Sequence, residues 1–90
     1  MTPLEQRIAE LSARFSAQAG AERDALLAAL AAGDRETLQS RAHKLAGTAG
    51  MFGHDDIGEA AFALETAAET GADCAGPAHA LADMLGEISP

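Results

Sequence analysis

Apolar residues recur at helical spacing along almost the whole chain, and no segment alternates apolar and polar residues as a half-buried strand would. In chain order, the predicted apolar stripes are Leu4, Ile8, Leu11 and Phe15; Leu26, Leu27 and Leu30; Leu38, Ala42, Leu45, Ala49 and Phe52; Ile57, Ala61, Leu64 and Ala68; and Leu81, Met84, Leu85 and Ile88. The composition agrees, with three Phe, no Trp and no Tyr. The pattern therefore predicts an all-α protein.

Glycine and aspartate mark the ends of the second predicted helix. Gly33 ends the preceding helical unit, and Asp34 is suited to cap the N-terminus of the next helix. This helix runs to about Phe52, where Gly53 supplies the stop.

Similar signals delimit the last two predicted helices. Asp55 or Asp56 caps the third helix, which ends at Gly71. The dipeptide Gly76-Pro77 opens the fourth, because proline is favoured in the first turn of a helix.

The first two stripes raise a question of continuity. A single straight helix through both would place Glu22 in the middle of the apolar seam, so we expect a bend or break near Gly20. Short connections favour antiparallel neighbours. We therefore predict an antiparallel up-and-down four-helix bundle over a single domain, residues 1–90, with a separate N-terminal helical segment as an additional possibility.

The charge and the cysteine content exclude several classes of function. A net charge of −8 argues against nucleic-acid binding and does not favour anionic membranes, so a protein partner is expected. The segment 34–44 is the least acidic part, with three basic and two acidic residues. Cys74 is alone, so no internal disulfide forms. No leader or membrane-spanning run is present, and we expect a cytoplasmic monomer.

The second predicted helix carries a histidine beside glycines. On an ideal helix His43, Gly47 and Gly50 fall opposite the apolar stripe. We call Gly47 and Gly50 the glycine face. Each glycine inside a helix costs roughly 1 kcal/mol relative to alanine, so stability alone does not explain why the helix has two of them. The face leaves the imidazole accessible to another macromolecule. From the residues alone, His43 is equally well a functional residue or a passive surface residue.

Other chemistries fail on spacing. His43 and His54 are eleven residues apart, about 16 Å along a helix, so they cannot share a metal ion without a sharp fold-back. No His-x-x-x-His or Cys-x-x-Cys pair occurs, and the helical glycines follow no strand, so they do not form a nucleotide-binding loop. We expect no metal site and no cofactor, and we expect His54 and His79 to be passive.

The run from Ala42 to Gly53, followed by Ile57 and Leu64-Glu65, resembles the signature of the histidine-containing phosphotransfer (Hpt) domains of bacterial phosphorelays. The resemblance implies an antiparallel four-helix bundle with an exposed phosphoacceptor histidine midway along one helix. It assigns that role to His43.

The resemblance also implies a role in two-component signal transduction. His43 would accept a phosphoryl group from an aspartate of a response-regulator receiver domain, form phosphohistidine, and pass the group to another receiver. The receiver would supply the aspartate and magnesium, and a hybrid histidine kinase is a further candidate partner. The chain would then be a phosphocarrier and co-substrate without kinase activity of its own.

One position departs from the family pattern, because Ala46 stands where the family has a lysine. Lys44 is rotated about 100° from His43 and reaches a phosphoryl group less directly. Gln39, one turn before His43, could hydrogen-bond the imidazole or its phosphoryl group. We list Gln39, Lys44, Gly47 and Gly50 as candidate phosphoryl or partner contacts. The competing hypothesis is a phosphorylation-independent interaction module, in which His43 is only a contact residue.

Overall fold

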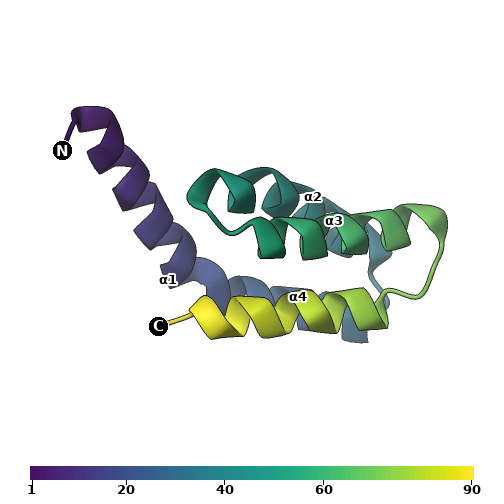
Figure 1. Ribbon diagram of the computed structural model, residues 1–90. Coiled ribbons are helices and arrows are strands. Elements are labelled where there is room, and N and C mark those ends of the chain that lie inside the picture. The colour runs from purple at the N-terminus through teal and green to yellow at the C-terminus, as the bar shows by residue number, and fades with distance from the viewer.

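The computed structural model describes residues 1–90 (Figure 1). It contains four helices, α1 (Pro3–Ala31), α2 (Arg35–Ala49), α3 (Asp55–Thr70) and α4 (Ala75–Ile88), and a short 3-10 helix, η1 (Gly50–Phe52), directly after α2. The helices pack antiparallel and no strand is present, which confirms the predicted all-α four-helix bundle. No helix combines the length and the apolarity that crossing a membrane requires.

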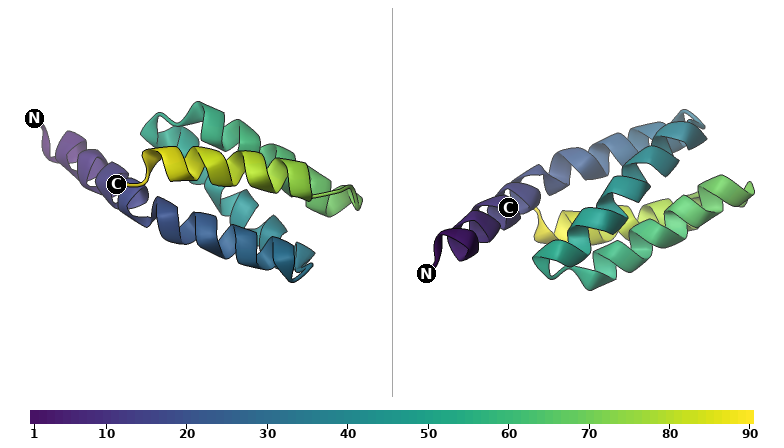
Figure 2. Two further views of the ribbon diagram at one scale, coloured as in Figure 1. Left: turned by 90° about the horizontal axis from the view of Figure 1, so that it is seen from below. Right: turned by 90° about the horizontal axis from the view of Figure 1, so that it is seen from above.

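The bundle has two layers. Figures 1 and 2 show the C-terminal part of α1 beside α4 in one layer and α2 beside α3 in the other. Each helix contributes to the core between the layers, and the largest fully buried side chains are Leu26, Leu38, Ile57, Leu64, Leu81 and Leu85. Full burial of one such side chain contributes about 1.5–3 kcal/mol, so the core stabilises the position of each helix.

The ends of α2 agree with the prediction. The Asp34 side chain accepts hydrogen bonds from the Thr37 hydroxyl (2.7 Å) and the Thr37 backbone N–H (3.1 Å). These two hydrogen bonds lower the pKa of Asp34, because they favour its charged form. At the other end, η1 continues the helical path to Phe52, and Gly53 follows with φ of 83°. This left-handed conformation favours glycine.

The start of α3 differs from the prediction. His54 is the N-cap residue, and neither Asp55 nor Asp56 caps the helix. Both aspartates lie in the first turn, where a negative charge is favoured by the helix dipole. Asp56 accepts a hydrogen bond from the backbone N–H of Ile57 (2.9 Å). At the C-terminal end Gly71 adopts a left-handed conformation, as expected of a stop signal.

The buried residues of α3 and α4 differ in part from the predicted apolar stripes. On α3 the fourth buried position is Ala67, while Ala68 is only half-buried. On α4, which begins one residue before Gly76, alanines share the core with leucines, while Met84 and Ile88 are half-buried.

The alternative of a break in α1 is wrong, because the helix is continuous over 29 residues. The alternative of a bend agrees with Figures 1 and 2, in which the axis of α1 changes direction part-way along. Two contacts explain why Gly20 and Glu22 do not interrupt it. A Cβ atom at Gly20 would lie 2.8 Å from Oγ of Ser89, so glycine provides room for the end of α4. The Glu22 carboxylate accepts a hydrogen bond from Arg41 at 2.9 Å. The acidic residue in the seam is therefore paired with a base on α2.

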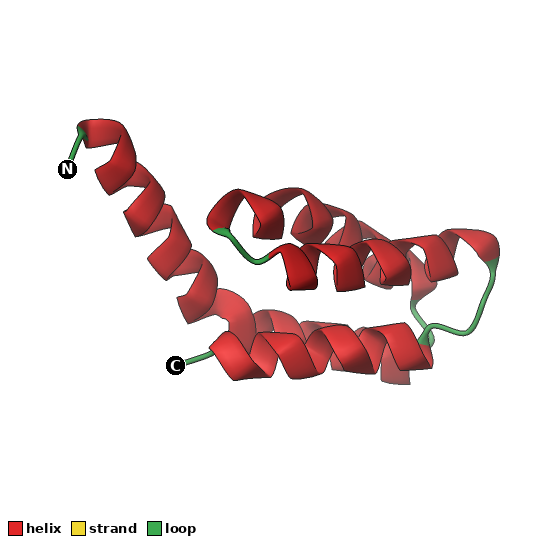
Figure 3. Ribbon diagram, in the orientation of Figure 1, coloured by secondary structure: helices red, strands yellow, loops and turns green.

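The N-terminal part of α1 leads away from the other helices, and no break separates it from the rest of α1 (Figures 1 and 3). All of residues 1–10 are exposed, including Leu4 (70% exposed) and Ile8 (43%). The first predicted apolar stripe therefore does not face the core at these two residues. Phe15 lies close enough to the bundle to pack against the core, and Leu11 is half-buried.

Candidate functional site

His43 lies near the middle of α2, on the side away from the core. The buried residues of this helix are Leu38, Ala42, Leu45 and Ala49, and the His43 side chain is 75% exposed. The phase of the helix is therefore the predicted one, and the imidazole is open to solvent.

One side of the imidazole is held by α3. The Nδ1 atom of His43 lies 2.6 Å from Oε2 of Glu65, whose side chain is only 13% exposed. A carboxylate can only accept a hydrogen bond, so Nδ1 carries the proton and donates it. The neutral ring then has its free electron pair on Nε2. The contact fixes both the tautomer and the orientation of the ring.

Sequence reasoning missed the role of Glu65. The residue was noted only as part of the Leu64-Glu65 pair. Leu64 is fully buried and Glu65 follows it, about 100° further around α3, which is the side toward α2. The contact could not be expected from spacing, because 22 residues separate Glu65 from His43. The presence of Leu64-Glu65 in the family signature was the one indication that Glu65 has a role.

Gln39 does not bond to the imidazole, contrary to one predicted role. Its Nε2 atom donates a hydrogen bond to Oε1 of Glu69 on α3 (3.1 Å). The pairs Gln39–Glu69 and His43–Glu65 are therefore successive links, one turn apart, between two antiparallel helices. Gln39 helps to hold α3 in register beside the histidine.

The glycine face is open next to His43. A Cβ atom at Gly47 would have no neighbour within 4 Å, and one at Gly50 would meet only Oδ1 of Asp55 at 3.6 Å. Ala46 is half-buried against the core and supplies no charge. On α2 beyond His43, Gly47 and Gly50 therefore present no side chain, which leaves room for another macromolecule.

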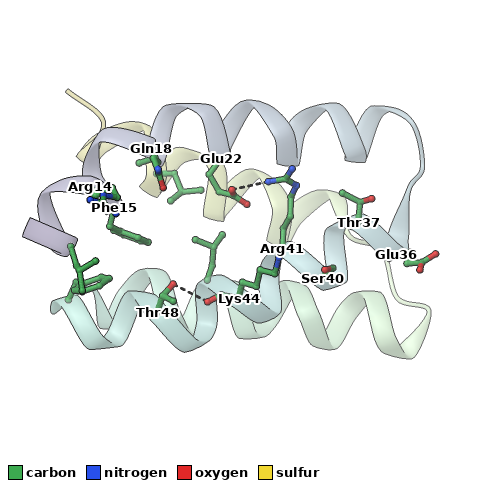
Figure 4. Close-up of a pocket in the computed structure, with 15 residues that line it drawn as sticks. Arg14, Phe15, Gln18, Glu22, Glu36, Thr37, Ser40, Arg41, Lys44 and Thr48 are labelled. Atoms are coloured by element: carbon green, nitrogen blue, oxygen red, sulfur yellow. Dashed lines mark hydrogen bonds and ion pairs between the residues drawn. The ribbon is translucent and has the colours of Figure 1, made fainter. Parts of the chain in front are cut away.

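Lys44 lies on a different side of α2 from Glu65. It lines a groove of about 660 Å³ between α1 and α2, which we call the α1–α2 groove (Figure 4). Its side chain takes part in no ion pair, whereas the neighbouring Arg41 is paired with Glu22 across the same groove. The site thus has an acidic side toward α3 and a basic residue toward α1.

The remaining histidines and the cysteine are far from forming a metal centre. No group of three His, Cys, Asp or Glu residues could hold an ion. The ring of His54 stacks on Phe15 of α1 with centroids 5.5 Å apart, His79 is exposed, and Cys74 is buried.

A model of the family described as "Hpt domain" matches residues 10–89. The chain belongs to the Hpt domain family. Hpt domains carry out histidine phosphotransfer in phosphorelays and exchange phosphoryl groups with receiver domains. No curated protein and no solved structure matches this Hpt domain. The match begins at Glu10, so about the first two turns of α1, residues 3–9, precede it.

Proposed function

We propose that His43 is the phosphoacceptor of this Hpt domain, accepting a phosphoryl group from the aspartyl phosphate of one receiver and returning it to the aspartate of another. The observation that carries the proposal is the exposed imidazole whose Nδ1 is bound to Glu65, 2.6 Å away. Among the three histidines, only His43 combines an open ring with an ion-pairing carboxylate.

The contact with Glu65 supports attack by Nε2. The electron pair of Nε2 forms the N–P bond while the P–O bond of the aspartyl phosphate breaks, and the aspartate leaves as a carboxylate. The ring becomes an N-phosphorylated imidazolium, which keeps its proton on Nδ1. The Glu65 carboxylate stabilises this positive charge as it develops. The reverse transfer needs no further proton donor or acceptor in this chain.

The surroundings of His43 support approach by a folded partner. The glycine face at Gly47 and Gly50 offers no side chain that would obstruct a receiver. Lys44 and the amide of Gln39 flank the histidine on its two sides and are proposed partner contacts. Ala46 cannot supply the family's lysine charge, so Lys44 would be the nearby cation of this chain, and a magnesium ion of the receiver would neutralise most of the phosphoryl charge.

The second candidate is a phosphorylation-independent interaction module. The exposed glycine face fits a docking surface equally well, and this function would not need the histidine. The two hypotheses differ in what replacement of His43 does, because glutamine keeps a polar side chain of similar reach but cannot form phosphohistidine.

The deciding experiment has two parts. Phosphoramidate, a small phosphodonor for histidine, is incubated with the chain and with His43→Gln and His79→Gln variants, and the product is located by mass spectrometry. We expect acid-labile phosphate on His43, retained in His79→Gln and absent in His43→Gln. A panel of phosphorylated receiver domains then tests transfer to and from His43. Phosphate on another histidine would contradict the assignment, and unchanged partner function in His43→Gln would favour the interaction module.

A further inference from the structure

The N-terminal part of α1 presents apolar side chains that no other helix covers. We call residues 1–14 the arm. Leu4 and Ile8 are 70% and 43% exposed, and together with Leu11 they lie on one side of the helix. Met1, which precedes the helix, is 90% exposed. A contiguous exposed apolar stripe of this kind marks an interaction surface in soluble proteins. Residues 1–9 of the arm lie outside the range that matches the Hpt family.

The stripe runs directly into the α1–α2 groove. Leu11 continues the stripe and also lines the groove, whose apolar floor includes Phe15 and Leu45. The exposed stripe of the arm and the apolar side chains of the groove therefore form one continuous surface, and the other residues that line the groove are polar. The length of this surface along α1 suits a helix laid alongside, which is a common way for grooves between helices to bind partners.

The charges around this surface indicate what chemistry it binds. Arg7, Arg23 and Arg41 pair with carboxylates, and Arg35 donates to the backbone carbonyls of Ala67 and Ala72. The two remaining basic residues, Arg14 and Lys44, make no ion pair or side-chain hydrogen bond. Figure 4 shows Arg14 on the α1 wall of the groove and Lys44 on the α2 wall. The groove is also lined by two acidic residues: Glu22, which is paired with Arg41, and Glu36, which lies toward the end away from Arg14 (Figure 4). In a chain of net charge −8, Arg14 and Lys44 are therefore the unpaired cations that an acidic partner meets in the part of the groove nearer the arm.

The charge pattern disfavours a second copy of the chain. With the stripe at heptad positions a and d, Arg7 and Arg14 fall at position g, and Glu5, Ser12 and Ala19 fall at position e. A parallel pair of arms would place the arginines opposite Ser12 and Ala19, and an antiparallel pair would bring the two arginine flanks together. Neither arrangement forms an ion pair between copies.

We propose that the arm and the α1–α2 groove form a docking surface for an amphipathic helix of a protein partner, with acidic residues flanking its apolar stripe. Leu4 and Ile8 supply the apolar contact, and Arg14 and Lys44 bind the acidic flanks. This surface lies on another side of α2 from Glu65 and shares only Lys44 with the proposed phosphotransfer site, so Leu4→Ser/Ile8→Ser tests docking without changing that site.

The test uses two synthetic helical peptides of about 18 residues, which share a leucine stripe and differ only in having glutamate or lysine at the flanking positions. Binding to the full chain is measured by fluorescence anisotropy at low and high salt. We expect the glutamate peptide to bind at least about tenfold more tightly than the lysine peptide, a difference of about 1.4 kcal/mol, and to weaken as salt rises. Because only the peptides differ, this comparison uses the unmodified chain.

Variants then locate the site. Leu4→Ser/Ile8→Ser and Arg14→Gln/Lys44→Gln should each weaken binding of the glutamate peptide at least about tenfold, while His79→Gln should not change it. These side chains are on the surface, so the melting temperature should stay within a few degrees of the unmodified chain. Amide NMR shifts caused by the peptide should centre on residues 4–18 and 41–48.

Three results would overturn the proposal. Equal binding of the two peptides would show that Arg14 and Lys44 do not select acidic flanks. NMR shifts centred on α3 would place the peptide on another face. Sedimentation of the chain as a dimer that Leu4→Ser/Ile8→Ser dissociates would identify a second copy as the occupant. Phosphorylation of His43 by phosphoramidate is measured separately, so failure of the docking proposal and failure of the phosphoacceptor proposal are distinguishable.

Discussion

The imidazole of His43 on α2 and the carboxylate of Glu65 on α3 are 2.6 Å apart, although 22 residues separate them in the chain. The two side chains differ strongly in exposure, at 75% for His43 and 13% for Glu65. The bundle thus holds one ring nitrogen from the inside and leaves the other accessible from the outside. This arrangement orients a reactive group without burying it.

Replacing Glu65 by glutamine should slow phosphorylation of His43 by about tenfold or more, because the neutral amide no longer stabilises the imidazolium that forms during transfer. Glutamine can also donate to Nδ1, which would move the ring proton to Nε2 and block attack. The rate is measured with a phosphorylated receiver. The matched control is Glu69→Gln, one turn further along α3, which removes a charge that does not contact His43. Equal slowing in both variants would mean that only the general charge of α3 matters.

Gly47 should affect stability and transfer in opposite directions. No atom lies within 4 Å of a Cβ at this position, so Gly47→Ala should stabilise the domain by up to about 1 kcal/mol through helix propensity. Gly47→Gln should also keep or raise the melting temperature, yet its side chain should reduce transfer from a receiver by at least about tenfold. Undiminished transfer in Gly47→Gln would show that the receiver docks elsewhere.

A pair of leucines on α1 should differ sharply in their contribution to stability. Leu26 is fully buried, so Leu26→Ala should lower the free energy of unfolding by about 2–5 kcal/mol. Leu4 is 70% exposed, and Leu4→Ala should change the free energy of unfolding by no more than about 0.5 kcal/mol. Chemical denaturation of both variants measures the difference. A large loss in Leu4→Ala would mean that the arm packs against the bundle in solution.

Asp34 should make the stability of α2 depend on pH. Hydrogen bonds from Thr37 lower the pKa of Asp34 below its ordinary value of 3.8. Its charged form therefore stabilises the fold at pH values above 3.8, and this contribution is lost as the pH falls through the lowered pKa. Asp34→Asn keeps an oxygen acceptor but removes the charge, so its melting temperature should be lower than that of the unmodified chain at about pH 6 and should converge with it in acid. A constant difference at all pH values would show that the charge makes no contribution.

The apolar pattern was sufficient to place the helices and the phase of α2. Asp34, Gly53 and Gly71 mark helix ends because capping depends on residues three or four apart and on the conformational freedom of glycine. His43 lies opposite the buried stripe for the same local reason, since the helical repeat alone determines which side chains share a face. These properties could therefore be predicted from the sequence.

Contacts between helices decided the rest. Glu22 looked like a reason to break α1 until Arg41, on another helix, supplied its partner, and Gly20 proved to make room for Ser89. The stripe at Leu4 and Ile8 was indistinguishable from a core stripe, because periodicity shows that a helix has an apolar face and does not show what covers it. Glu65 could be paired with His43 only once α2 and α3 were packed side by side. Local hydrogen bonding and helical repeat are encoded in neighbouring residues, whereas pairing across the bundle depends on how all four helices share one core.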